Sequence, residues 1–553
     1  MQFNALKLAP TVINYINEIK ASYEQCIDEI KASYEQRIDE IKASYEQRID
    51  EIKASYEQRI KESDNKYLIL KEQYDLLLYK RFMRSAEELK ADTKQPLLFT
   101  EEATEAEDAK EKDEFTEVKS HKRNKKGRKA IAADIERKER VIDIPEAEKT
   151  CACGEKLSRI GEETSEKLVI IPAEVYVDKI IRPKYICRTC EGIEDEDKPT
   201  IRIAPIEPSL IPRSIVSPSL LSTIMVQKYE YHLPFYRQEK LFNQIGVKIS
   251  RQDMCNWQQK AYKALAPLFL LLEKTLRSGP VIRMDETTVQ VVNEKDRDYS
   301  QKSYMWLALG GHEGKTVVLY EYCQTRSSEY AKIILKGYCG YLQTDGYSVY
   351  DSVVKLFPGI IHVGCFAHAR RKFFEAAKIA EQGDTAKRGI EFIRLLYQIE
   401  SELRNEKEEK KKTDDEFLME RKARAGPVLT DLKTWLLNNV ASVPPGCLLG
   451  KAIKYSLSQW DKLIRYLESP YLTPDNNACE NAIRPFVLGR KNWLFNQSAD
   501  GAKSSCGMYS LIETAKQNGL VPQHYLMALF EKAPLASSQE DWEKLLPWNI
   551  FTP

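Results

Sequence analysis

The sequence lacks several features that mark large classes of proteins. It has almost no net charge, since 84 Lys and Arg residues against 83 Asp and Glu residues leave +1, and so no overall basic charge points to nucleic acid. No apolar run approaches the roughly 18 residues of a membrane-spanning helix. The best candidate, residues 265–276, contains Pro267 and Glu273. The first ten residues have neither the basic nor the apolar segment of a secretory signal, and we expect a soluble intracellular protein.

Cysteine is also too sparse for a disulfide scaffold, at twelve residues in 553. The length predicts three or four domains, since a domain has roughly 100–200 residues. Charged residues make up 30% of the chain and hydrophobic residues 42%. Ordinary globular domains have about 25% and 45–50%. The excess of charge indicates long solvated helices or charged linkers beside normal cores.

Residues 18–61 consist of an eleven-residue unit, EIKASYEQRID, that occurs four times with small changes. Its Ile and Tyr residues are spaced 4, 4 and 3 apart, or about 3.67 residues per turn, which favours a slightly right-handed supercoil. From Tyr67 the spacing returns to heptads. One helix over residues 18–90 would extend about 110 Å. We favour a coiled coil that forms a homo-oligomer over a solvated single helix, because a continuous apolar stripe needs a partner to bury it.

The composition then changes twice. Residues 101–114 hold eight acids and two lysines, which indicates an unfolded linker. Residues 119–129 hold seven basic residues and no acid. This basic run is either a solvated tail or an arm that follows DNA phosphates, and its composition fits both equally well. The DNA-binding candidates within it are Lys125, Lys126 and Arg128.

Two close cysteine pairs follow the basic run. One residue separates Cys151 from Cys153, two separate Cys187 from Cys190, and strand-like residues lie between the pairs. Two such pairs about 35 residues apart fit a Cys₄ zinc ribbon, in which four thiolates hold a structural Zn²⁺ tetrahedrally. The alternative is four unrelated buried thiols, and we favour the ribbon.

Residues 216–263 are predicted to be helical. Helices are expected at 220–228 and 235–244, followed by a turn at Gly246 and a helix capped by Ser250. A helix, a glycine turn and a capped second helix fit a helix-turn-helix that binds DNA. A plain helical hairpin fits them as well.

From Gly279 to residue 380, three strand-like runs are followed by alternating helices and strands. The order β-β-β-α-β-α-β-α is typical of a ribonuclease-H-like fold, an antiparallel meander that continues into parallel crossovers. Asp285 lies in the first strand and Asp345 at the carboxyl end of the fourth. Neighbouring carboxylates repel unless a cation neutralises them, so this pair predicts Mg²⁺. The alternative, two independent strand-end aspartates, is less favourable because an Asp inside an apolar strand is costly.

Residues 383–470 are predicted to be almost wholly helical. After them, Asp475 or Asn476 can cap a short helix that places Glu480 one turn before Arg484. Residues 488–495 are then expected to form a strand with side chains suited to phosphates and base stacking.

Together these motifs resemble those of transposases of the insertion sequence 66 family, a DDE-type group. The matching segments are, in order, LLLYKRFMRSAEEL, GRKAIAAD, IGEETSEKL, RPKYIC, KYEYHLPFYRQ, MDET, QTDGY, CFAHARRKFF, DNNACENAIRPFVLGRKNWLF, YSLIETAKQNG and LLPW. They cover residues 67–548 and leave only the eleven-residue repeats outside. The motif around Glu480 is very specific.

The resemblance implies that Asp285, Asp345 and Glu480 form a catalytic triad, with residues 383–470 inserted between the second and third acids. It implies two Mg²⁺ or Mn²⁺ ions, attack by water that frees a 3′-hydroxyl at the element end, and attack of that hydroxyl on target DNA. The implied partners are the terminal repeats, the target DNA and accessory proteins of the same element. The implied location is the bacterial cytoplasm, with action at the nucleoid.

Other residues near these motifs are less decisive. Glu286 and Asp475 are spare carboxylates, but Glu286 should face away from Asp285 because adjacent strand residues point to opposite faces. Cys365 and His368 form a C-x-x-H signature seen in this kind of transposase. We favour a structural contact that supports the active site over zinc there, because no second ligand pair is evident. The remaining phosphate-binding candidates, each of which could instead form a surface ion pair, are Arg370, Arg371, Arg484, Arg490 and Lys491.

The predicted fold class is multidomain α+β. The expected segments are a coiled coil at 1–95, a charged linker with a basic arm at 96–145, a zinc ribbon at 146–195, a helix-turn-helix-like region at 205–265, a ribonuclease-H-like core at 275–380 and 471–500, a helical insertion at 381–470 and a helical C-terminal segment at 501–553. The predicted function is metal-dependent DNA cleavage and strand transfer at element ends. The alternatives are a catalytically inactive DNA-binding regulator and a hydrolase that only cuts nucleic acid.

Overall fold

The structure, a computed structural model, describes residues 10–82, 175–186, 201–295, 297–298, 301–379 and 383–550. It divides into two compact units, one formed by residues 105–207 and the other by the rest of the chain. The charged linker, the basic arm with Lys125, Lys126 and Arg128, and the four zinc-ribbon cysteines lie outside the described residues. No helix among the described residues combines the length and apolar character that crossing a membrane requires.

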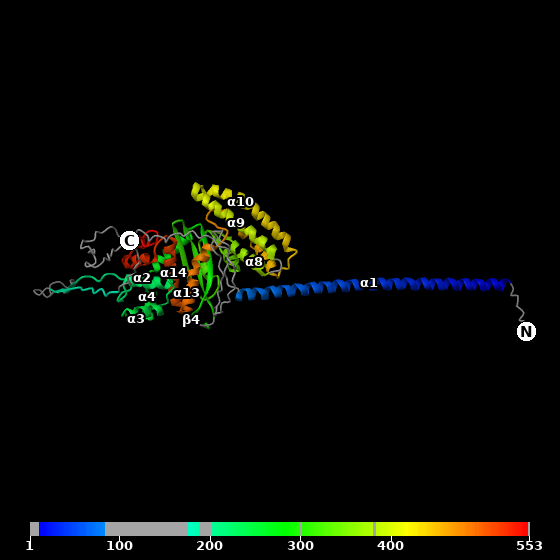
Figure 1. Ribbon diagram of the computed structural model, residues 1–553, viewed down its shortest axis with the longest axis horizontal. Helices are drawn as coiled ribbons and strands as arrows, with labels where there is room; N and C mark the ends of the chain where they lie inside the picture. Colours follow the sequence, from blue (N-terminus) through cyan, green and yellow to red (C-terminus); the bar gives the residue numbers. More distant parts are fainter. Residues whose placement is uncertain are drawn as a thin grey trace, which may run out of the picture. The chain divides into compact units, whose positions relative to one another are not determined.

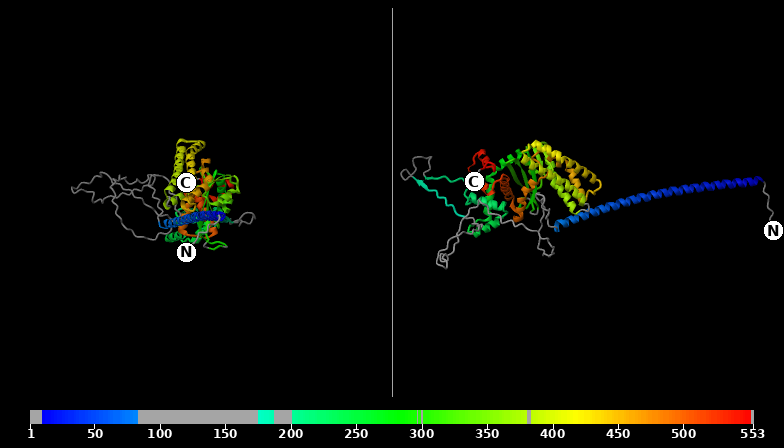
Figure 2. Two further views of the ribbon diagram at one scale, coloured as in Figure 1. Left: turned by 90° about the vertical axis from the view of Figure 1, so that its right-hand side faces the viewer. Right: turned by 45° about the horizontal axis from the view of Figure 1, so that its top comes forward.

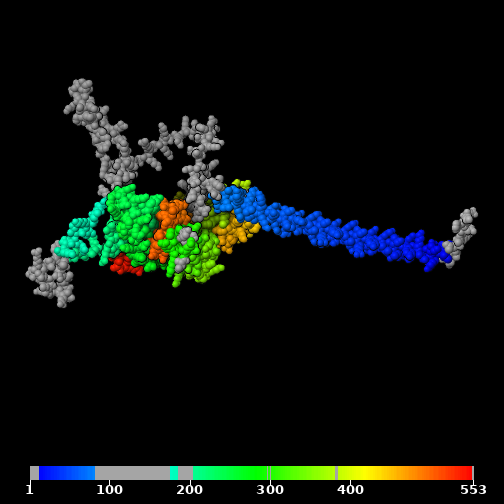
Figure 3. Space-filling view, turned by 90° about the horizontal axis from the view of Figure 1, so that it is seen from below, coloured from blue at the N-terminus to red at the C-terminus, as the bar shows by residue number. Residues whose placement is uncertain are grey.

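Helix α1 runs without interruption from Pro10 to Phe82, which confirms the predicted long helix (Figures 1 and 2). Its 73 residues extend about 110 Å. The stripe of Ile and Tyr residues is exposed along the repeats, with exposed fractions between 41% at Ile19 and 69% at Tyr23. In Figure 3 this part of α1 is the blue rod. Each unit also carries a Gln-to-Glu hydrogen bond four residues apart, the first from Gln25 to Glu29 at 2.9 Å.

The last part of α1 packs on the helical segments around residues 366–379 and 448–458. Glu72 is only 5% exposed, and its Oε2 accepts the backbone N–H of Leu448 at 2.7 Å. A carboxylate at this position satisfies a helix N-terminus and its dipole. Lys80 forms an ion pair with Glu375 at 3.0 Å. The C-terminal part of α1 is therefore anchored, whereas its repeats are exposed.

The unit of residues 105–207 contains one described strand pair. β1 (Lys184–Ile186) pairs antiparallel with β2 (Ile201–Ile203). Arg182 donates a hydrogen bond to the carbonyl oxygen of Ala204 at 2.9 Å, which extends the pairing. These residues include part of the strand-like segment expected between the cysteine pairs.

The predicted helical region forms α2 (Pro218–Tyr229), α3 (Phe235–Gln244) and α4 (Arg251–Ala264), followed by α5 (Ala266–Ser278). The bounds of α3 match the prediction, and Ser250 caps α4 in a reciprocal capping box with Asp253. Gly246 adopts a φ of +81°, which suits a glycine after α3. Gln258 of α4 donates to Ser504 at 2.7 Å, so this region packs on the sheet-bearing core.

The core is a five-stranded mixed sheet with strand order β6-β5-β3-β7-β8. Its elements are β3 (Val281–Val289), β5 (Ser303–His312), β6 (Lys315–Cys323), α6 (Glu329–Ile334), β7 (Gly340–Gln343), α7 (Ser348–Val354), β8 (Ile360–Val363) and α8 (Phe366–Ile379). β3, β5 and β6 pair antiparallel, and β3, β7 and β8 pair parallel. This confirms the predicted order of strands and helices. A short strand β4 (Val291–Asn293) pairs with β9 (Asn496–Ser498).

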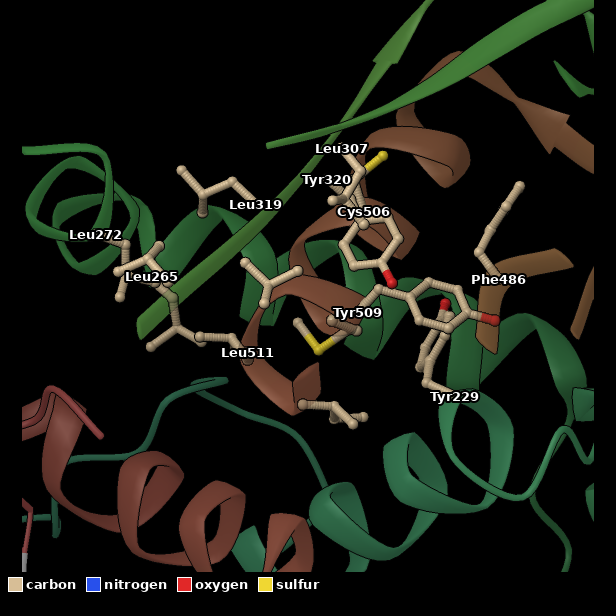
Figure 4. Close-up of a cluster of buried hydrophobic side chains, with 14 of the residues drawn as sticks. Tyr229, Leu265, Leu272, Leu307, Leu319, Tyr320, Phe486, Cys506, Tyr509 and Leu511 are labelled. Carbon is tan, nitrogen blue, oxygen red and sulfur yellow. The ribbon is translucent and has the colours of Figure 1, made fainter. Parts of the chain in front are cut away.

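The C-terminal segment packs along the β6 edge of the sheet. Two hydroxyl groups of α14 (Ala499–Gln517) accept backbone N–H groups of β6: Ser510 from Tyr320 at 2.8 Å and Thr514 from Val318 at 3.0 Å. These bonds satisfy an edge strand that would otherwise offer unpaired N–H groups. The buried rings of Tyr229 and Tyr320 both contact the ring of Tyr509 on this helix (Figure 4). Helices α15 (Pro522–Lys532) and α16 (Gln539–Glu543) complete the segment.

Residues 383–470 are helical, as predicted. They form α9 (Gly383–Lys410), α10 (Asp414–Val440), α11 (Leu448–Ser458), α12 (Trp460–Leu463) and a 3₁₀ helix η2 (Ile464–Glu468). The long helices α9 and α10 lie side by side (Figure 1). With α8 and α11 they enclose a second hydrophobic cluster.

The strand expected at residues 488–495 is wrong. Residues 488–493 instead continue α13 (Asn477–Trp493), which is also longer than the short helix expected. The reason is burial at helical spacing: Cys479, Ile483 and Phe486 face the core. Gly489 allows the close approach, because a Cβ atom there would collide with the side chains of Trp493 and Tyr509.

Arg421 provides a test of how the helical insertion is fixed. This side chain is fully buried on α10, pairs with Glu400 at 2.8 Å and donates to the carbonyl oxygens of Tyr466 and Ser469 at 2.7 and 2.9 Å. Arg404 also pairs with Glu400 at 2.8 Å, so Arg421→Met would remove one of two cations there and would leave two carbonyl oxygens without this donor. We expect a loss of about 2–4 kcal/mol in unfolding free energy. Urea unfolding followed by circular dichroism measures it.

The matched control is Arg394→Met, because Arg394 forms an exposed ion pair with Glu391 on α9. We expect that variant to stay within about 0.5 kcal/mol of the original protein. Equal effects of the two substitutions would contradict a special role for the buried arginine.

Candidate active site

The pairing of β3 with β7 brings Asp285 and Asp345 to the same level of the sheet. The two strands are parallel, and Arg283 of β3 lies opposite Gln343 of β7. Asp285 lies two residues after Arg283, and Asp345 lies two residues after Gln343. Asp345 lies just beyond the carboxyl end of β7, where its Oδ1 accepts the backbone N–H of Tyr347 at 2.9 Å. Sequence reasoning expected the strands of the two aspartates to be neighbours, and β3 and β7 do pair.

Glu480 reaches the same place from the first turn of α13. The residues before it are tied to β3 and to the start of α8. Asn476 donates its side-chain amide to the carbonyl oxygen of Met284 at 3.0 Å, directly before Asp285. Its backbone N–H donates to the Sγ of Cys365 at 3.2 Å. The helix that carries Glu480 therefore begins against the strand that carries Asp285.

The electrostatics of Asp285 reflect this convergence. Burial raises the pKa of Asp285 well above its usual range, and the nearby carboxylates of Glu286, Glu480 and Asp345 raise it further. A buried carboxylate among three others is unfavourable when ionised, and a cation among them would offset the repulsion. Carboxylate oxygens are the ligands that Mg²⁺ and similar hard cations prefer, so these residues fit such an ion.

Cys365 and His368 lie beside Glu480. The Nδ1 atom of His368 is 3.7 Å from the Oε1 atom of Glu480, and Nη2 of Arg371 is 3.8 Å from Oε2. Burial and the positive charge of Arg371 lower the pKa of His368 to about 4, so this ring is neutral at pH 7 and forms no ion pair. Burial, with the charges of Glu480 and Asp475, raises the pKa of the Cys365 thiol well above its usual range.

These three residues form a compact set of potential ligands. Among the described residues, the ligand atoms of Cys365, His368 and Glu480 lie within 4.8 Å of one another, and neither aspartate belongs to that group. Cys365 is a neutral thiol that accepts the N–H of Asn476 at the start of α13.

The two spare carboxylates have other contacts. Glu286 accepts hydrogen bonds from Nη2 of Arg326 at 2.6 Å and from the Tyr350 hydroxyl at 2.6 Å. Asp475 accepts the backbone N–H and the side-chain amide of Asn477 at 3.0 and 2.7 Å. Both carboxylates hold local structure in this arrangement.

The basic candidates lie on two helices, Arg370 and Arg371 on α8 and the other three on α13. Arg490 donates to the hydroxyl groups of Thr287 and Thr288 on β3 at 2.9 and 3.1 Å, so its Nη1 atom joins α13 to the sheet. Lys491 is exposed. Sequence reasoning described Arg490 as a phosphate ligand or a surface ion pair, and it anticipated neither this contact nor its threonine partners.

Sequence reasoning also missed the residues that hold the segment before Glu480. Arg283 donates to the carbonyl oxygen of Tyr471 at 2.9 Å, and Gln343 donates to that of Thr473 at 2.6 Å. The signal that could have found them is the polar side chain inside each apolar strand. Arg421 offered no such signal, because it lies among many other charges on α10.

The raised pKa of Asp285 predicts a pH effect on stability in protein freed of divalent metals. Below the ordinary pKa of about 3.9 the carboxyl is protonated in both states. Above it, ionisation favours the unfolded chain, so stability falls as pH rises through the window up to the folded-state pKa. Asp285→Asn should remove this contribution and raise the unfolding temperature at pH 8 in EDTA by about 2–4 °C.

Differential scanning calorimetry at several pH values tests this, with Asp431→Asn on the exposed face of α10 as the control. A lower unfolding temperature for Asp285→Asn at pH 8 would contradict the expected repulsion.

Four family descriptions match this chain. The description "Transposase IS66 family", of the DDE type, matches residues 213–504, which include Asp285, Asp345 and Glu480. The "zinc-finger binding domain of transposase IS66" matches residues 148–191, which include Cys151, Cys153, Cys187 and Cys190. The "IS66 C-terminal element" matches residues 510–548, and "Transposase C of IS166 homeodomain" matches residues 69–140.

Relatives in Sinorhizobium fredii share much of the sequence. Uncharacterized protein y4jD is 31% identical over 429 residues, which cover 74% of this chain and 79% of the relative. Uncharacterized protein y4hP is 30% identical over 455 residues, 78% of each chain. The family matches indicate a transposase that binds DNA, a structural zinc in the zinc finger and a divalent metal in the DDE region. The chain belongs to the IS66 family of transposases.

Proposed function

We propose that the five-stranded sheet is a ribonuclease-H-like core that cuts element ends and joins them to target DNA by a DDE mechanism. The convergence of Asp285, Asp345 and Glu480 carries this proposal. Asp285 lies in β3, and Asp345 lies two residues after the paired parallel strand β7. Glu480 lies on α13, which follows the helical insertion at residues 383–470. The three-stranded antiparallel meander followed by two parallel strands supports the assignment of the fold.

Each acid has a role in this proposal. Asp285, Asp345 and Glu480 would hold two Mg²⁺ ions. Bound divalent ions supply contacts to the attacking and leaving oxygens of an in-line phosphoryl displacement. Glu480 is kept in place by the contacts of Asn476 with β3 and with Cys365. Arg371, whose Nη2 atom is 3.8 Å from Oε2 of Glu480, is proposed to contact the phosphates.

Two displacements at phosphorus account for the reaction. In the first, the oxygen of water forms a bond to phosphorus and the bond to the 3′ oxygen breaks, which frees a 3′-hydroxyl at the element end. In the second, that hydroxyl oxygen forms a bond to a target phosphorus and the target's own 3′ oxygen leaves. No protein side chain becomes covalently attached, because carboxylates that bind metal do not act as the nucleophile.

DNA binding is proposed to extend beyond the acids. Arg370, Arg371, Arg484 and Lys491 present positive charge from α8 and α13, and phosphate contacts of this kind make affinity fall with salt. The zinc finger, the helices α2 to α4 and the basic arm are proposed to recognise element ends. Accessory proteins of the same element remain expected partners.

Oligomerisation is proposed to occur through α1. The exposed Ile and Tyr stripe of the repeats is continuous, and a second copy of the same helix offers a matching surface. The anchored end of α1 at Glu72 would connect that oligomer to the helical insertion.

The first experiment tests the acids. Asp285→Ala, Asp345→Ala and Glu480→Ala should each reduce strand cleavage by about 10³-fold or more, because each would remove a metal ligand. Binding of element-end DNA should change by less than about threefold, since the phosphates are bound mainly by cations. Mapping strand breaks in flanking element DNA with Mg²⁺ measures the first, and gel-shift titration measures the second.

Asp431→Ala on α10 is the matched control for removal of a carboxylate and should cleave normally. Unchanged cleavage by all three triad variants would refute the assignment. Binding of element ends without any cleavage by the original protein would favour an inactive DNA-binding regulator. Cleavage without joining would favour a hydrolase.

The second experiment tests the repeats. Deletion of Glu29–Asp39 removes one eleven-residue unit, which rotates the following stripe by only about 20° and should preserve the oligomer. Deletion of Glu29–Ser33 removes five residues and rotates the stripe by about 140°, which should weaken association. Light scattering over a concentration series gives the mass of each variant. A monomer after the eleven-residue deletion would contradict a continuous coiled coil.

A further inference from the structure

The C-terminal end of α13 is a strained turn with two large apolar side chains in solvent. Leu494 has φ 65° and ψ −46°, and the N–H of Phe495 donates to the carbonyl oxygen of Trp493 at 2.7 Å. This is the geometry of a classic γ-turn, which is rare and strained, and a leucine at its centre is an outlier. Leu494 is 69% exposed and Phe495 is 47% exposed.

The chain on both sides of this turn is fixed. The N–H of Leu494 donates to the carbonyl oxygen of Arg490 at 2.7 Å, and that of Asn496 to the carbonyl oxygen of Gln290 at 2.8 Å. Asn496 also begins β9, which pairs with β4. Trp493 packs with the rings of Tyr229 and Tyr509. These contacts hold the strained backbone and keep Leu494 and Phe495 pointed away from the core.

Folding alone does not account for these residues. A glycine at position 494 would relieve the strain, and polar side chains at both positions would avoid exposing apolar surface. Where a sequence breaks local rules with no gain in packing, a functional contact is the physical explanation to test. The partner must then accept apolar side chains on a rigid support.

The rest of α13 identifies that partner. Glu480, Arg484 and Lys491 are spaced by four and seven residues, which places them within about 40° of one another around the helix. One face of α13 therefore carries the third acid, then two cations, and ends in the apolar turn. Cations at intervals match a phosphate backbone, and leucine and phenylalanine are residues that enter between base steps.

We infer that Leu494 and Phe495 form an apolar wedge that enters the base stack of the element-end DNA. The fourteen residues from Glu480 to Leu494 correspond to about 21 Å along α13 at about 1.5 Å per residue. At about 3.4 Å per base pair, the wedge meets the duplex about six base pairs from the cleaved bond. This inference rests on the proposed function, because it takes the DNA to be held at Glu480.

Insertion of the wedge unstacks a base step, and this gives a direct signal. The full-length protein is mixed with duplexes of the flanking element end that carry 2-aminopurine at successive positions around the sixth base pair. We expect a several-fold rise in fluorescence at one or two of these positions and little change at the others. Binding alone suffices for this measurement, so it is made with Ca²⁺ in place of Mg²⁺ to prevent cleavage.

Three variants define the role of the side chains. Leu494→Gly and Phe495→Ala should abolish the fluorescence rise and reduce cleavage of a perfect duplex by about tenfold, because unstacking is no longer assisted. A mismatch at the responsive position lowers the cost of unstacking, and it should restore cleavage by these variants to within about twofold. Leu270→Ala on α5 is the matched control, since Leu270 is also an exposed leucine at 65%.

Glycine at position 494 relieves strain, so the melting temperature of that variant should not fall and misfolding cannot explain its loss of cleavage. Normal cleavage and fluorescence in both wedge variants would overturn the inference. So would loss of cleavage that no mismatch restores. If the original protein raises the fluorescence but cleaves no flanking DNA, the proposed chemistry fails while the wedge stands. Cleavage without any fluorescence rise refutes the wedge alone.

Discussion

The parallel pairing of β3 with β7 is the constraint on which the rest of the site depends. It sets Arg283 opposite Gln343 and thereby brings Asp285 and Asp345 to the same level at one rim of the sheet. Burial and the neighbouring acids then raise the pKa of Asp285, because ionised carboxylates at this rim repel one another. Such a site lowers the stability of the folded protein, and the surrounding packing must offset this loss, as is common where function and stability conflict.

The helical insertion also helps to position the third acid. It separates the second acid from the third in the chain. Its buried Arg421, which pairs with Glu400, donates to the carbonyl oxygens of Tyr466 and Ser469 in the segment that leads back to the sheet. Arg283 of β3 and Gln343 of β7 donate to the carbonyl oxygens of Tyr471 and Thr473, which follow in the same segment. The position of Glu480 is therefore determined by both the insertion and the sheet.

The sequence predicted the elements well and their contacts poorly. The bounds of α3, the cap at Ser250 and the order of strands follow from capping and periodicity, which are local properties. The strand expected at residues 488–495 was wrong because the burial of Phe486 and the space made by Gly489 override local preference. Arg490 was expected at a phosphate or in an ion pair, and only the helix packing shows that it binds Thr287 and Thr288.

By itself the sequence determined the long helix, the alternation of strands and helices, and the acids that the family motifs mark. These features depend on the spacing of residue types along the chain, which determines local structure directly. Only the tertiary structure decided how the segment before Glu480 is held, that Glu286 is bound by Arg326 and Tyr350, and that Leu494 is strained and exposed. These facts depend on contacts between residues far apart in the chain, or on a backbone angle that is stable only because both flanks are fixed. No pattern in the sequence indicates these contacts or this backbone angle.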